Sequence, residues 1–225
     1  MESSDVSFLL EKMEQMNVLV ACELTGITRN AFRFRGCNAF SCDLLPSEDN
    51  SRYHMQMDAL VAIESRRWDL VIAHPPCTDL ASSGARWFEE KRKDGRQAQS
   101  IKFFESIRDL ANENSTSYVI ENPIGIMSTI WRKPDQIIQP WQYGDEATKT
   151  TCLWLKGLPK LKPTKVVGRG KRHVTKSGRS LPAWYNIPPT VKDRAKIRSR
   201  TFPGIAEAMA DQWGTMEQMK GEEDE

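Results

Sequence analysis

The chain lacks the features that mark membrane and secreted proteins. No apolar run approaches the roughly 20 residues that cross a bilayer. Its first residues, MESSDVSFLLEKMEQM, are acidic and amphipathic, whereas a signal peptide is basic and then apolar. The five cysteines are odd in number and include no C-x-x-C pair, and His54 and His173 show no ligand spacing, so we expect neither disulfides nor a metal site. These absences predict a cytoplasmic protein without membrane contact.

The net charge of +2 conceals a strong segregation of charge along the chain. Between Lys156 and Arg200, fourteen Lys and Arg residues accompany a single acidic residue, Asp193, so this segment carries +13 and the remainder −11. One basic block on an otherwise acidic protein indicates a polyanionic partner, and nucleic acid is the obvious one.

Short apolar runs alternate with helical patterns before this basic block. Strands are predicted at 17–22, 38–43, 54–58, 68–77, 117–123 and 152–155, with helices at 28–36, from 58 to about 66, and at 97–113. This alternation predicts an α/β fold with a doubly wound, mostly parallel, Rossmann-like sheet. We expect a core at 1–156, an irregular and partly mobile basic insertion at 157–200, a helix at 201–217 that returns to the core, and an acidic tail at 218–225.

Five predicted strands end in polar or reactive side chains, in the order Glu23, Asp43, Asp58, Cys77 and Glu121. Ligands of open α/β sheets gather at the carboxyl ends of the strands, so these side chains are the candidates for a site. Each has a structural alternative, and for Asp58 a helix cap is equally consistent with the sequence.

The stretch ACELTGITRNAF joins the first strand to a helix through Gly26, whose backbone could approach a ligand at the helix start. Asp43 follows about twenty residues later, where an acid can bind a ribose hydroxyl. The stretch has no G-x-G-x-x-G cluster to hold a pyrophosphate. A nucleoside cofactor without one is therefore predicted, and S-adenosylmethionine meets that description.

The stretch IAHPPCT places Cys77 after two prolines at the end of a strand. A lone cysteine is often a buried small hydrophobe, but this presentation favours a nucleophile. The HPPC stretch invites comparison with the D/N-P-P-Y/F loops of amino-methyltransferases, yet Cys77 stands where their aromatic residue stacks on the base. A thiolate suits addition to an electron-poor ring carbon instead. Glu121, in VIENPIG, could protonate or hydrogen-bond a ring nitrogen during that addition.

These motifs resemble the DNA (cytosine-5) methyltransferases, whose signature pairs a Pro-Cys loop with a Glu-Asn motif. The similarity is greatest to short phage-type members, through IAHPPCT, IENPIGIMS, PWQYGDEATKTTCLWLKGLP and RTFPGIAEAMADQWG. The resemblance implies a class I S-adenosylmethionine-dependent fold, with Cys77 as nucleophile, Glu121 at cytosine N3 and Lys149 at O2. The implied cofactor contacts are Cys22, Glu23, Leu24, Thr25, Gly26, Asp43, Leu44, Asp58, Ala59 and Pro75.

The large target-recognition domain of that family is absent, so its role falls to the basic insertion. The residues expected to bind double-stranded DNA are Lys171, Arg172, Lys176, Arg179, Trp184, Arg198 and Arg200. Trp184 alternatively anchors the insertion to the core. We expect a monomer or weak dimer in a bacterial or phage-infected cell. RNA cytosine methylation and a catalytically inactive DNA-binding or anti-restriction protein of the same fold remain open.

Overall fold

A seven-stranded mixed sheet in the order β3-β2-β1-β4-β5-β7-β6 forms the centre of the protein. The computed structural model describes residues 15–215 except 176, 189 and 193. The strands are β1 (Asn17–Ala21), β2 (Asn38–Asp43), β3 (His54–Gln56), β4 (Trp68–Ala73), β5 (Ser115–Pro123), β6 (Gln136–Ile138) and β7 (Thr151–Lys156). The first five pair in parallel, whereas β7 is antiparallel to both β5 and β6. The predicted α/β, mostly parallel sheet is confirmed and is compatible with a Rossmann-like fold.

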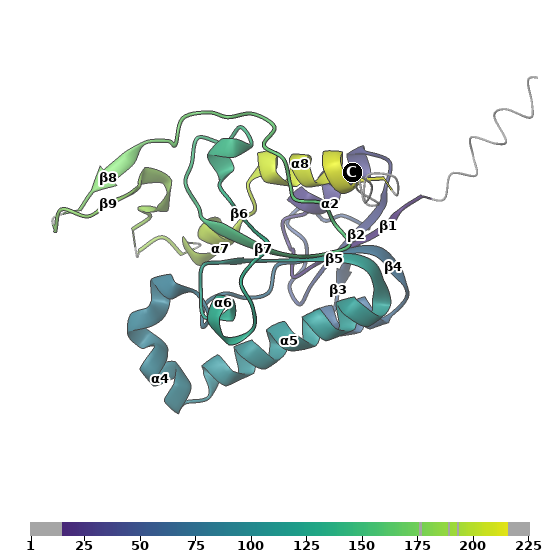
Figure 1. Cartoon of the computed structure of the whole chain (residues 1–225), viewed down its shortest axis with the longest axis horizontal. Coiled ribbons are helices and arrows are strands. Elements are labelled where there is room, and N and C mark those ends of the chain that lie inside the picture. The colour runs from purple at the N-terminus through teal and green to yellow at the C-terminus, as the bar shows by residue number, and fades with distance from the viewer. Residues whose placement is uncertain (1–14, 176, 189, 193, 216–225) are drawn as a thin grey trace, which may run out of the picture.

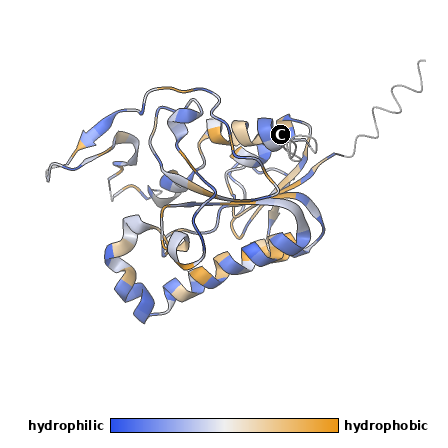
Figure 2. Ribbon diagram, in the orientation of Figure 1, coloured by the Kyte–Doolittle hydropathy of each residue, from blue (hydrophilic) through white to orange (hydrophobic). Residues whose placement is uncertain are grey.

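Helices cover both faces of this sheet, which explains why its strands are continuous apolar runs. In Figure 1, α2 (Ile27–Phe34) and α8 (Pro203–Trp213) lie above the sheet, and α5 (Arg96–Asn114) and α6 (Met127–Ile130) lie below it. The short α3 (Ala59–Glu64) packs on the same core cluster as α5. Figure 2 shows apolar residues concentrated along the sheet and the inner sides of the helices.

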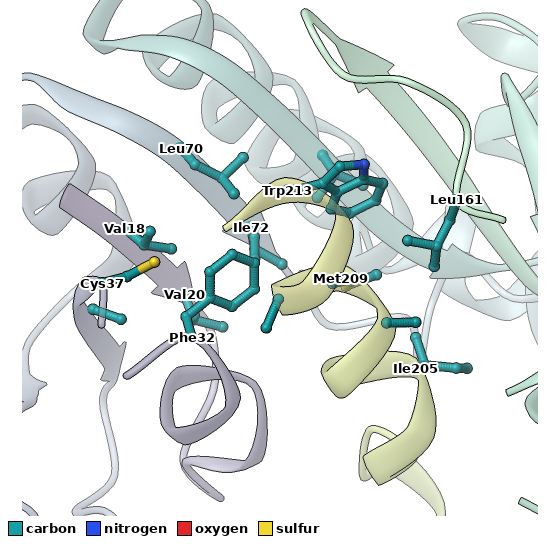
Figure 3. Close-up of a cluster of buried hydrophobic side chains, with 14 of the residues drawn as sticks. Val18, Val20, Phe32, Cys37, Leu70, Ile72, Leu161, Ile205, Met209 and Trp213 are labelled. Carbon is teal, nitrogen blue, oxygen red and sulfur yellow. The ribbon is translucent and has the colours of Figure 1, made fainter. Parts of the chain in front are cut away.

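The upper core joins distant parts of the chain. Trp213 and Met209 of α8 pack with Phe32 of α2 against Val20 and Ile72 of the central strands (Figure 3), and each of these five side chains is fully buried. The helix predicted around Pro203 is confirmed. After α2, Gly36 follows Arg35 with φ 84°, a left-handed conformation that favours glycine and ends the helix.

Several predicted element boundaries were wrong. The third strand ends at Gln56 rather than at Asp58, because Asp58 turns outward and caps α3 through its side chain. The fourth was expected to stop at Pro75–Pro76, and it ends two residues earlier, at Ala73, because the two prolines have no backbone N–H to continue the ladder. The antiparallel β6 was missed because it has only three residues, one of them exposed.

The basic insertion contains regular structure that the sequence did not predict. A hairpin of β8 (Arg172–Val174) and β9 (Ser180–Pro182) projects at the left of Figure 1, and α7 (Arg194–Ser199) leads back to α8. The remaining short helices are η1 (Ser82–Trp87), α4 (Phe88–Lys93), η2 (Pro140–Gln142) and η3 (Ala183–Tyr185). The predicted acidic tail at 218–225 lies outside the described residues. Among the described helices, none is both long enough and apolar enough to span a membrane.

Candidate active site

The carboxyl ends of β1 and β4 form the switch point of the sheet, where the chain progresses outward in opposite directions. Ala21 and Ala73 are neighbours across this pair, and the His74 N–H donates to the Ala21 carbonyl at 2.9 Å. The loop from Cys22 to Gly26 and the loop that carries Cys77 therefore start side by side. This is the position at which ligands of open α/β sheets bind.

The Cys77 loop is held against the end of β5. The Asn122 side-chain amide donates to the Pro75 carbonyl at 2.8 Å, and Asn122 is buried. Further along, the Ile126 N–H donates to the Leu80 carbonyl at 3.0 Å. A Cβ at Gly125 would lie 2.2 Å from that carbonyl oxygen, so only glycine permits this approach. The HPPC and ENP motifs thus form one unit.

Lys91 of α4 supports the same loop from the other side. Its ammonium group is almost completely buried, donates to the Thr78 carbonyl at 2.5 Å and pairs with the Asp79 carboxylate at 3.0 Å. The sequence analysis did not identify Lys91, because it looks like one of several charges on an exposed helix. These contacts fix the residues that follow Cys77.

The Cys77 thiol is largely buried in a mixed electrostatic environment. Burial raises its pKa above the ordinary value and the Glu121 charge adds to the rise, whereas Lys149 and Lys91 partly offset it. Cys77 is therefore a thiol at neutral pH in the free protein. It becomes a nucleophile only if its proton is transferred during the reaction.

Glu121 lies inside β5, two residues before its end at Pro123, and next to the β4 end that carries His74. Its Oε2 lies 3.1 Å from His74 Nδ1. Burial alone would raise the pKa of Glu121, but the hydrogen bond from His74, the charge of Lys149 and the Thr151 side chain hold it below the ordinary value. Glu121 is therefore a carboxylate at neutral pH.

A small cavity lies between these side chains and the start of α8. His74, Glu121, Lys149 and Thr151 line one side of it, and Thr201, Phe202, Ile205 and Met209 line the other. The Lys149 ammonium donates to the carbonyls of Ser199 and Arg200, at 3.4 and 3.1 Å. The end of the basic insertion is thereby attached to the site. Sequence analysis proposed Glu121 and Lys149 but assigned no role to His74 or Thr151.

The predicted cofactor residues near β1 serve mainly in local structure. Glu23 is buried, and its two carboxylate oxygens accept from the N–H groups of Thr28 and Arg29 at 2.7 and 3.1 Å, so it caps α2. A Cβ at Gly26 would lie 2.2 Å from an Arg29 guanidinium nitrogen. The space that Gly26 provides is thus filled by Arg29, which is fully buried and paired with Asp49.

Other predicted residues of this loop are also tied into the fold. The Thr25 hydroxyl accepts from the Ile27 N–H at 3.3 Å, and the Leu24 carbonyl accepts from the Glu48 N–H at 2.8 Å. Cys22 adopts a left-handed conformation with φ 61°, and burial together with the neighbouring Cys42 raises the pKa of its thiol. Because these residues are held by such contacts, the carboxyl end of β2 is the more open part of the predicted cofactor site.

At the end of β2, Asp43 accepts from the Leu45 N–H at 2.9 Å and remains partly exposed. Leu44 and Leu45 expose 68% and 58% of their surface, which is unusual for two adjacent leucines at a sheet edge. Asp58 accepts from the Leu60 N–H at 2.7 Å as the N-cap of α3, and Ala59 is buried behind it. The Asp43 carboxylate at the end of β2 and the two leucines that follow it could contact a nucleoside. Among the described residues, no group of three or more His, Cys, Asp or Glu side chains could hold a metal ion.

The predicted nucleic-acid residues fall into two groups. Lys171, Arg172 and Arg179 are exposed on the hairpin, while Lys176 lies outside the described residues. Of the others, Trp184 and Arg200 contact the body of the protein, and Arg198 contacts another part of the insertion.

In the second group, Trp184 donates from its indole nitrogen to the Thr148 carbonyl at 3.3 Å and packs edge-on against Phe202. This is the anchoring role that was the alternative to base stacking. Arg200 pairs with Glu48 at 2.6 Å, and Arg198 lies 3.1 Å over the ring of Tyr185. The exposed cations of the hairpin are therefore the more accessible ones.

No protein-family model matches this chain, and no curated protein matches its sequence.

Proposed function

We propose that this protein transfers a methyl group from S-adenosylmethionine to C5 of cytosine in DNA. The observation that carries the proposal is the joined unit of HPPC and ENP motifs. A cysteine follows the end of one parallel strand, an ionised glutamate lies near the end of the next, and Asn122 connects the two segments. These are the two groups that cytosine methylation at C5 requires, and they match the motifs that resemble the cytosine-5 methyltransferases.

In the proposed reaction, Cys77 sulfur forms a bond to cytosine C6. The C5=C6 electron pair becomes a C4=C5 bond, the C4=N3 pair moves onto N3, and N3 gains a proton. Because Cys77 is a thiol in the free protein, its proton balances the one that N3 acquires, and the Glu121 carboxylate can accept it and pass it on. Lys149 stabilises the negative charge that develops toward O2. Once C5 carries the methyl group, its proton is lost to solvent and the Cys77 sulfur leaves C6, which restores the C5=C6 bond. The proton on N3 returns to the sulfur and regenerates the Cys77 thiol.

The residues at the carboxyl end of β2 suit the nucleoside part of the cofactor. Leu44 and Leu45 offer an apolar surface for a purine ring, and the Asp43 carboxylate suits a ribose hydroxyl. When bound, S-adenosylmethionine supplies an electrophilic methyl group. Since Glu23 and Gly26 are engaged with α2 and Arg29, we assign the principal cofactor contacts to β2 rather than to the β1 loop.

The hairpin supplies the DNA contacts in this proposal. Its exposed Lys171, Arg172 and Arg179 can neutralise phosphates without reading sequence. A cytosine in a duplex must leave the base stack to reach Cys77, at a cost of about a few kcal/mol. Lys149 donates to the Arg200 carbonyl at the end of the insertion, so the chain segment that carries the hairpin also borders the site, which supports this assignment.

The first experiment uses duplex DNA that carries 5-fluorocytosine together with labelled S-adenosylmethionine. Fluorine at C5 cannot leave as a proton does, so the enzyme should remain covalently bound to methylated DNA. We expect a labelled adduct with the wild type and none with Cys77→Ala. Cys37→Ala is the matched control, because Cys37 is buried at the opposite end of the sheet, immediately before β2.

The outcomes separate the candidate functions. An adduct that persists in Cys77→Ala would contradict the role of this thiol. No adduct with duplex DNA but one with 5-fluorocytosine RNA would move the proposal to RNA. Strong DNA binding without any adduct would indicate an inactive DNA-binding protein.

A further inference from the structure

Within the part of the chain that the structure describes, one ring nitrogen of His74 has no hydrogen-bond partner. The residue follows β4 directly, its backbone is fixed by the Ala21 carbonyl, and two prolines follow it. The side chain is 11% exposed. Nδ1 lies against Glu121, whereas Nε2 is buried and has no hydrogen-bond partner among the described residues. A buried polar atom of this kind calls for an explanation, and one is a contact with a ligand.

The contact with Glu121 determines which nitrogen carries the proton. An ionised carboxylate only accepts hydrogen bonds, so Nδ1 must donate to it. In the neutral ring, Nε2 is then an acceptor with a free lone pair. His74 lines the small cavity together with Glu121 and Lys149, and the residues of α8 that line the other side are uncharged. The charged groups around the imidazole are thus one carboxylate and one ammonium.

Together these three side chains present two acceptors and one donor. The imidazole Nε2 and the Glu121 carboxylate accept, and the Lys149 ammonium donates. Cytosine protonated at N3 offers the complementary set, with a 4-amino donor, an N3–H donor and an O2 acceptor. Uracil also offers an N3–H donor and an O2 acceptor, but an oxygen acceptor replaces the amino group at C4. The group at C4 is therefore the only difference between the two bases along this edge. Glu121 and Lys149 alone do not distinguish an amino group from an oxygen there.

We propose that His74 Nε2 accepts a hydrogen bond from the 4-amino group of the target cytosine and so selects cytosine against uracil. This inference rests on the proposed function and adds a specificity residue to it. The contact strengthens as N3 gains its proton, because the amino group then carries more positive charge. His74 therefore favours the adduct with Cys77 over the unreacted base.

The test compares two DNA duplexes that differ only in the 4-amino group of the target. One contains 5-fluorocytosine, and the other contains 5-fluoropyrimidin-2-one, which keeps the fluorine, lacks a substituent at C4 and still accepts a thiolate. Adduct formation is timed for the wild type and for His74→Asn, whose side-chain amide can still donate to Glu121 but lacks an acceptor at the Nε2 position. The adduct rate of the variant on 5-fluorocytosine should fall about tenfold relative to the wild type, as expected for one neutral hydrogen bond, with no change on 5-fluoropyrimidin-2-one.

A second pair of variants covers the case in which His74→Asn does not fold. His74→Gln and His74→Met have similar lengths, and only Gln brings an oxygen acceptor into the cavity. Gln should retain the preference for 5-fluorocytosine, and Met should lose it. If every variant forms the adduct more slowly by the same factor on both duplexes, the inference is overturned. His74 would then have a role in folding or in orienting Glu121. Absence of any adduct with the wild type would instead overturn the proposed function.

Discussion

At the scale of single residues, the site depends on Glu121 being ionised inside the protein. Burial opposes ionisation, but His74, Lys149 and Thr151 outweigh it. The same carboxylate raises the pKa of Cys77, so the two groups are linked before any substrate binds. The protonation states of Cys77 and Glu121 are therefore coupled.

This ionisation predicts a pH dependence of stability. A carboxyl group whose pKa is lower in the folded than in the unfolded state stabilises the fold above its unfolded pKa, and that contribution is lost as pH falls through the folded pKa. The difference in unfolding free energy between wild type and Glu121→Gln should therefore be largest above about pH 5 and shrink toward pH 3.

Urea unfolding between pH 3 and 7 measures this difference. Glu89→Gln is the control, because Glu89 forms only an exposed helical ion pair with Lys93. A difference for Glu121→Gln that stays constant over the whole range would show that this carboxyl titrates alike in both states.

At the scale of secondary-structure elements, the hairpin of β8 and β9 stands apart from the sheet. Its two strands pair only with each other, and its basic side chains are exposed. Arg172 contacts Ser180 across the hairpin, which leaves Lys171 and Arg179 as the best candidates for phosphate contacts. The hairpin can therefore be altered without disturbing the core.

Lys171→Gln and Arg179→Gln should each weaken DNA binding and reduce its salt dependence. Every phosphate contact contributes about 0.9 to the slope of log affinity against log salt concentration. Fluorescence anisotropy with a labelled duplex from 50 to 300 mM salt gives this slope.

Lys102→Gln on α5 is the control, since Lys102 is exposed on the helix that covers the lower face of the sheet. It should leave the slope unchanged. If the hairpin variants also leave it unchanged, the DNA lies elsewhere on the protein.

At the scale of the whole molecule, the end of α8 is hydrogen-bonded both to the residue before β2 and to the segment that follows β7. The Trp213 indole donates to the Pro159 carbonyl at 3.1 Å, and the Cys37 thiol donates to the Gly214 carbonyl at 3.2 Å. Ile205 and Met209 of the same helix reach the cavity beside Glu121. One helix thus completes the core and borders the site.

Trp213→Ala should therefore destabilise the entire fold. The side chain is fully buried, and truncation of such a residue costs about 3–5 kcal/mol. Trp213→Phe should cost less because it keeps most of the volume and loses only the hydrogen bond to Pro159.

Urea unfolding followed by circular dichroism measures both changes. Trp87→Ala is the matched control, because Trp87 is 49% exposed. A loss for Trp213→Ala no larger than that of the control would show that α8 is dispensable for the core.

The sheet was predictable from sequence where a strand forms a continuous apolar run. The four residues from Val18 to Ala21 in β1 and from Leu70 to Ala73 in β4 are all fully buried, and such runs are a local signal. The three-residue strands β6, β8 and β9 were not predictable, because each is short and partly or wholly exposed. Their pairing depends on neighbours elsewhere in the chain.

The candidate site likewise combines residues that the sequence identified with contacts that only the tertiary structure shows. Cys77 and Glu121 could be named from sequence, because a proline-flanked cysteine and an acid at strand ends are local patterns with a chemical meaning. The contact of His74 with Glu121 spans 47 residues, and Lys149 reaches carbonyls about 50 residues away. Only the tertiary structure showed that Glu23 and Gly26 serve α2, that Trp184 anchors the insertion, and that His74 keeps an unpaired nitrogen in the cavity. Strand formation and residue chemistry are encoded locally, whereas partners and protonation states are decided by side chains that folding brings together.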